Sequence, residues 1–189
     1  MLVLIGGLLL FIGLHVQRRM LPAFRRDLIA FIGDAAFKGA LSLLLVASLV
    51  FIVIGYRSWD AGLVYSPFPG AGFVNNLLMI GSIFLFGVGF SGGPLSARIR
   101  HPMLLGVVSW SIAHLLVNGD GASVVMFGTL GLWAMVQMRM INQHEGPWVK
   151  PMPGNAVQDA KLFLTALFIY VVIAGVHWLF GLNVFSGNY

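Results

Sequence analysis

Two histidines mark the part of the chain whose residues are best suited to chemistry. His101 stands at one end of an apolar run of membrane length, and His114 lies inside that run. An ionisable ring within a membrane span is costly unless something uses it. Four-residue spacing on a helix would align one face of this run, made of Gly106, Trp110, His114 and Asn118. The row indicates either a ligand site, with Gly106 leaving room for a flat group, or a histidine that hydrogen-bonds a neighbouring helix.

The start of the same run combines a helix cap with positive charge. His101 precedes Pro102, which suits the first turn of a helix, so His101 is expected at the N-cap. Helix N-termini attract anions, and Arg98 and Arg100 add to that attraction. The cluster predicts a site for a cofactor carboxylate or phosphate, or equally an anchor for lipid headgroups.

The remaining histidines give weaker signals. His15 lies near the end of the first apolar segment, three residues before Arg18, where an interfacial histidine that reaches water is the simplest interpretation. His144 lies in a polar stretch, and His177 precedes Trp178 near the opposite interface, where aromatic residues are enriched. Neither of these last two is predicted to be a ligand.

The ligand types in the chain restrict its metal chemistry. There are no cysteines, the 6 acidic residues are scattered, and no H-x-x-x-H spacing occurs, so zinc and di-iron sites are poorly supported. Two histidines on different helices that face a flat apolar slot are a common way for a membrane bundle to hold haem b.

Composition identifies the elements that must position these side chains. With 59% hydrophobic and 9% charged residues among 189, the chain is predicted to be a single integral membrane domain over residues 1–189. The net charge of +5 is spread beside apolar segments, which favours membrane topology over nucleic-acid binding.

The predicted fold is all-α, a polytopic transmembrane bundle of about six spans with a short interfacial helix after the first. That helix starts near Pro22, and residues 146–154 are too rich in Pro and Gly for helix. The turn Asn118-Gly119-Asp120 predicts a tight antiparallel hairpin of the fourth and fifth spans. The six apolar runs cover residues 2–17, 38–56, 73–92, 102–118, 121–138 and 161–181.

Charge distribution predicts the orientation. All of the Lys and Arg residues except Arg57 fall on one side of the predicted spans. Because positive residues concentrate on the cytoplasmic side, both termini are expected to face away from the cytoplasm. In a bacterial inner membrane that side is the periplasm.

Several motifs together resemble the NnrU family over most of the first 140 residues. They are Gly13-Leu14-His15 before a basic segment, Gly33-Asp34 with Phe37, Arg100-His101-Pro102 with Gly106, and the run from Trp110 to Asp120 followed by Phe127-Gly128. The resemblance implies a multi-span membrane protein. Bacterial members are named for a link to nitrite and nitric oxide metabolism, and plant and cyanobacterial relatives are haem b-dependent 15-cis-zeta-carotene isomerases.

Carried over by position, the resemblance implies His15 and His114 as axial ligands of haem b, while the role of His101 stays open. It implies redox or isomerisation chemistry on a lipophilic substrate such as a cis-carotenoid. The alternative is a non-enzymatic accessory for nitrite and nitric oxide reduction. The R-H-P-x-x-x-G pattern from Arg100 to Gly106 also resembles membrane methyltransferases, but no Glu-x-x-Arg follows it, which disfavours methyl transfer.

Overall fold

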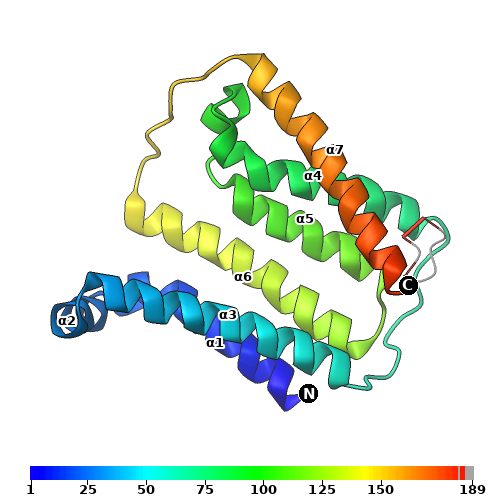
Figure 1. Cartoon of the computed structure of the whole chain (residues 1–189), viewed down its shortest axis with the longest axis horizontal. Coiled ribbons are helices and arrows are strands. Elements are labelled where there is room, and N and C mark those ends of the chain that lie inside the picture. The colour runs from blue at the N-terminus through cyan, green and yellow to red at the C-terminus, as the bar shows by residue number, and fades with distance from the viewer. Residues whose placement is uncertain (183, 186–189) are drawn as a thin grey trace. The chain divides into compact units, whose positions relative to one another are not determined.

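The computed structural model describes residues 1–182 and 184–185, and its regular elements in that part of the chain are all helical. Two compact units, Met1–Gly62 and Leu63–Tyr189, are each described by themselves. The elements are α1 (Leu2–Met20), α2 (Pro22–Ile32), α3 (Asp34–Ser58), α4 (Ala71–Ser91), the 3-10 turn η1 (Pro94–Ala97), α5 (Pro102–Val117), α6 (Gly121–Glu145) and α7 (Ala156–Leu179) (Figure 1).

Most of these helices are long and apolar enough to cross a membrane. Over the described residues, α1, α3, α4, α6 and α7 meet that criterion, and α5 is a shorter apolar helix of 16 residues. The all-α fold with about six spans is therefore confirmed. The prediction of a single domain over residues 1–189 stays a prediction.

In the first unit, glycines bring α1 and α3 into close contact. A Cβ on Gly7 would come within 2.8 Å of the Ile52 backbone nitrogen, and one on Gly55 would overlap the backbone of Leu4. Small residues allow such close approach between membrane helices. The predicted helix after the first span is present as α2, which begins at Pro22 and has no buried residues.

In the second unit, α4 is the central helix. It packs against both α5 and α7, and α5 packs in turn against α6 (Figure 1). Two serine hydroxyls strengthen the α4–α5 contact: Ser82 Oγ donates to the Gly106 carbonyl at 2.8 Å, and Ser109 Oγ donates to the Leu78 carbonyl at 3.0 Å.

The predicted hairpin is formed by α5 and α6 and is locked at its turn. The Asp120 carboxylate accepts hydrogen bonds from the Ser123 backbone N–H and hydroxyl, which caps α6. The Gly119 carbonyl accepts from the backbone N–H groups of Val64 at 2.8 Å and Tyr65 at 3.1 Å. The turn is therefore fastened to the loop between α3 and α4.

Candidate functional site

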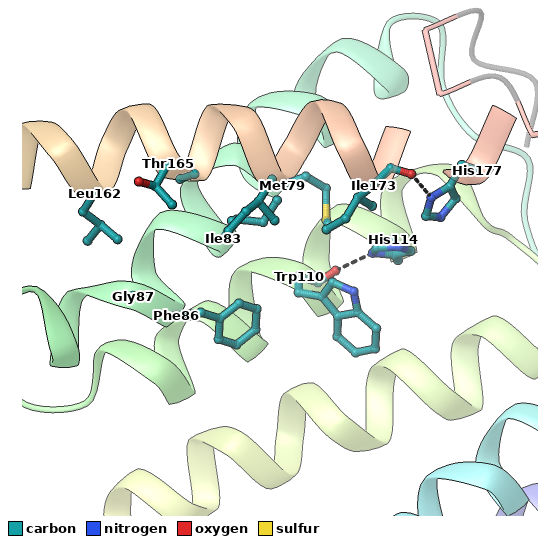
Figure 2. Close-up of a pocket in the computed structure, with 12 residues that line it drawn as sticks. Met79, Ile83, Phe86, Gly87, Trp110, His114, Leu162, Thr165, Ile173 and His177 are labelled. Carbon is teal, nitrogen blue, oxygen red and sulfur yellow. Dashed lines mark hydrogen bonds between the residues drawn. The ribbon is translucent and has the colours of Figure 1, made fainter. Parts of the chain in front are cut away.

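A cavity of about 460 Å³ lies between α5 and α7, with α4 as its floor (Figure 2). Its size falls within the roughly 300–1,000 Å³ of ordinary ligand pockets. Over the described residues, α5 and α7 each pack against α4, and they are not among the helix pairs in close contact with each other. The lining is mostly apolar and consists of Met79, Ile83, Phe86, Gly87, Trp110, His114, Leu162, Thr165, Ala166, Ile169, Ile173 and His177.

His114 is held in one orientation at this cavity. Its Nδ1 lies 3.0 Å from the Trp110 carbonyl oxygen, which can only accept, so Nδ1 carries the proton and Nε2 keeps its lone pair. The imidazole stacks on Phe127, with 4.5 Å between ring centroids and 23° between planes, and lies 5.1 Å from the Trp110 ring. These contacts fix the orientation of the His114 ring. Its Nε2 lone pair can then accept a hydrogen bond from a donor or bind a metal.

Gly106 differs from its predicted role. A Cβ there would lie 3.0 Å from the Phe86 ring and 3.1 Å from the Ser82 carbonyl oxygen. The space beside Gly106 is thus filled by α4, and the expectation that it leaves room for a flat group does not hold. The missing side chain serves the α4–α5 packing instead.

The other end of α5 carries the predicted anion cluster. His101 is the N-cap residue, as expected, and its Nε2 lies 2.8 Å from Asn142 Oδ1 on α6. Arg100 Nη1 donates to the Gly146 carbonyl at 2.8 Å, whereas Arg98 is exposed. These contacts hold the end of α6. His101 and His114 are 13 residues apart on one helix, about 20 Å along its axis, so they belong to separate sites.

Asn118, the last residue of the predicted row, makes hydrogen bonds at the end of α5. Its Nδ2 donates to the His114 carbonyl at 3.0 Å, and its own carbonyl accepts from the Tyr65 hydroxyl at 3.0 Å. The Tyr65 hydroxyl also contacts the Leu115 carbonyl. Burial and, secondarily, the nearby Asp120 carboxylate raise the pKa of Tyr65. Asn118 therefore stabilises the end of the helix that carries His114.

His15 lies in the first unit. The His15 Nδ1 is 2.8 Å from the Phe11 carbonyl oxygen, and the centroids of the His15 and Phe11 rings are 4.2 Å apart. His15 and His114 lie in different units, so the axial pair that the resemblance implies stays a prediction.

Two residues of the site escaped the sequence-based prediction. His177 was interpreted as part of an interfacial aromatic belt, yet it lines the cavity together with His114 (Figure 2). Phe127, which stacks on His114, belongs to the Phe127-Gly128 motif, from which the sequence predicts no role for it. The position of each histidine along its helix is a signal that could have identified His177. His114 and His177 each lie within one turn of the last residue of their helices.

Within the described residues, no group of three or more His, Cys, Asp and Glu side chains could hold a metal ion. A metal at this cavity would therefore need most of its ligands from elsewhere, as iron has in a porphyrin.

A family model described as NnrU protein matches residues 3–184, so the chain belongs to the NnrU family. No curated protein and no solved structure matches the chain.

Proposed function

We propose that this member of the NnrU family is an integral membrane haem b protein that acts on a lipophilic molecule by redox or isomerisation chemistry. The single observation that carries the proposal is His114, which lines an apolar cavity of about 460 Å³ between apolar helices while its Nδ1 is held by the Trp110 carbonyl. An imidazole fixed through its other nitrogen is the usual arrangement of an iron ligand.

The chemistry of the cavity fits the cofactor. Its walls are apolar, with an indole beside the imidazole, which suits the flat hydrophobic macrocycle. The bound group would supply an iron centre that changes oxidation state. The chain's own residues would bind it, orient the ligand imidazole through the Trp110 carbonyl, and accommodate an apolar substrate along α7.

The shape of the lining supports a long substrate. Leu162 and His177 line opposite ends of the α7 wall, 15 residues or about 22 Å apart along the axis. An extended lipophilic chain would use this length, whereas a compact polar metabolite would not. Under the orientation that the Lys and Arg distribution predicts, the His114 end of the cavity lies toward the periplasmic side of a bacterial inner membrane.

The test is to purify the protein in detergent after expression with ample haem. We expect a Soret band that shifts on dithionite reduction. His114→Ala should remove or greatly weaken that band, because it deletes the fixed imidazole. Trp178→Ala is the matched control, since the Trp178 side chain is exposed and does not line the cavity. Wild-type protein without a Soret band would refute the proposal.

A further inference from the structure

The first unit has a basic, amphipathic corner where α1, α2 and α3 meet. We infer that this corner binds an anionic glycerophospholipid, with the lipid phosphate at Arg25 and the acyl chains along the apolar face of α2. α2 contacts both neighbouring helices and lies across one end of the α1–α3 pair (Figure 1). Because α1 and α3 are long and apolar enough to span a membrane, a helix across their end lies along the membrane surface.

Positive charge is concentrated in this corner. Residues 18–38 hold five Arg and Lys side chains and two Asp side chains, which gives this segment a net charge of +3. Both carboxylates already have cationic partners. Asp27 Oδ1 is 3.1 Å from Arg26 Nε. Asp34 Oδ2 is 2.7 Å from Lys38 Nζ. The excess positive charge therefore complements the phosphate of an anionic lipid at the membrane surface.

Arg25 is the cation of this corner whose side chain is packed into the protein. Its guanidinium carbon lies 4.9 Å from the centre of the ring of Phe37, a buried residue of α3. This cation–π contact holds the guanidinium between α2 and α3. Among the described residues, the buried Arg25 Nε has no hydrogen-bond partner. Guanidinium binds phosphate through several donors at once, so a lipid phosphate would supply the acceptors that Arg25 lacks.

The order of residues in α2 places Arg25 at the border of an apolar face. Phe24 and Phe31 are seven residues apart, about two helical turns, so they lie on one face, where they are 62% and 87% exposed. At about 100° per residue, Arg25 flanks this face, whereas Arg26 lies on the far side of the helix. The apolar face and its flanking cation therefore match the acyl chains and the phosphate of one lipid molecule.

The apolar face of α2 also favours a lipid over a free phosphate ion. A soluble anion would use the charge at Arg25 but would leave the exposed rings of Phe24 and Phe31 in water. Under the orientation that the Lys and Arg distribution predicts, the corner faces the cytoplasmic leaflet, where anionic lipids give the membrane a negative surface potential. The position, the charge and the apolar face thus fit the same ligand.

The experiment measures lipid binding to the full chain in detergent by native mass spectrometry. The probes are phosphatidylglycerol and phosphatidylcholine with identical acyl chains, and wild type should bind phosphatidylglycerol more tightly. Arg25→Gln should weaken phosphatidylglycerol binding about fivefold, as expected for loss of one cation near an anionic headgroup. Arg26→Gln is the matched control. It removes the same charge from the far side of α2 and should weaken binding less than about twofold.

A second variant keeps the test valid if Arg25→Gln does not fold. Phe31→Ser changes an exposed side chain and no charge, so it should weaken the binding of both lipids while the melting temperature in detergent stays unchanged. Equal affinity of wild type for the two lipids would overturn the inference, and so would equal losses in Arg25→Gln and Arg26→Gln. Displacement of the bound lipid by excess inorganic phosphate would assign the corner to a free anion instead.

Discussion

The two ends of α5 differ in how their polar groups are satisfied. At the end near His114, several backbone and side-chain hydrogen bonds meet at the turn: the Gly119 carbonyl accepts two N–H groups from the loop before α4, the Asp120 carboxylate caps α6, and the Tyr65 hydroxyl donates to the Asn118 carbonyl. At the end near His101, single side-chain contacts reach α6 and the residue that follows it, through Arg100 and His101. One end is therefore held by several hydrogen bonds of both the main chain and side chains, and the other by single contacts of Arg100 and His101.

This difference indicates that a continuous sequence motif contains two kinds of site. A ligand imidazole needs a rigid support, and the end of α5 with several hydrogen bonds supplies it. The end near His101 connects α5 to α6 and to the residue after it through single contacts of Arg100 and His101. The following predictions test this contrast, from the largest expected effect to the smallest.

Gly119→Ala should destabilise the protein most. The new methyl would overlap the Tyr65 backbone carbonyl, so the loop must move and the two hydrogen bonds to the Gly119 carbonyl are lost. Overpacking together with these bonds should cost about 3 kcal/mol or more. Thermal unfolding in detergent measures the effect. Gly128→Ala is the matched control, because no atom lies within 4 Å of its Cβ position, and it should be neutral or slightly stabilising.

Asp120→Ala should cost about 1 kcal/mol of unfolding free energy, because it removes the N-cap of α6. Asp27→Ala is the comparison, since Asp27 forms only an exposed ion pair with Arg26 and should change the unfolding free energy by less than about 0.5 kcal/mol. Chemical denaturation of the two variants side by side measures the difference. Equal losses of unfolding free energy in Asp120→Ala and Asp27→Ala would contradict the proposal that the turn stabilises this end of α5.

Arg100→Ala should cost about 0.5–1.5 kcal/mol through loss of its hydrogen bond to the Gly146 carbonyl. Because this end of α5 is separate from the cavity, the variant should leave the Soret band of haem-loaded protein unchanged. Asn142→Ala, which removes the partner of His101, should behave alike. A Soret band weakened in either variant would instead support the predicted role of the cluster in binding a cofactor carboxylate.

Tyr65 should give the smallest effect, and only at alkaline pH. Its pKa is raised above the ordinary value of 10.0, so the folded state favours the neutral hydroxyl. The stabilisation is complete below pH 10 and is lost as the pH rises through the folded-state pKa. Phenolate absorbance and melting temperature against pH should both show this, and Tyr65→Phe should flatten the alkaline decline in melting temperature. An unchanged decline would assign it to another group.

Sequence patterns predicted the helices well because membrane spans are marked by local composition. The hairpin turn at Asn118-Gly119-Asp120 and the proline starts at Pro22 and Pro102 are local signals, and all three lie where expected. Such features depend on a few neighbouring residues, so the sequence predicts them even when the packing of the helices is not known.

The cavity could not be predicted in the same way because it depends on which helices share a neighbour. α5 and α7 are separated by the whole of α6, and only their common packing on α4 brings His177 to the cavity. Gly106 was misjudged for a related reason: a missing side chain can admit either a ligand or a helix, and here Phe86 occupies the space.

The shortness of α5 has a consequence for the surrounding bilayer. Its 16 residues span about 24 Å, whereas a hydrocarbon core is about 30 Å thick. This hydrophobic mismatch places the turn after Val117 short of the full core thickness, where the hydrogen bonds between the Gly119 carbonyl and the loop before α4 satisfy polar backbone groups inside the protein.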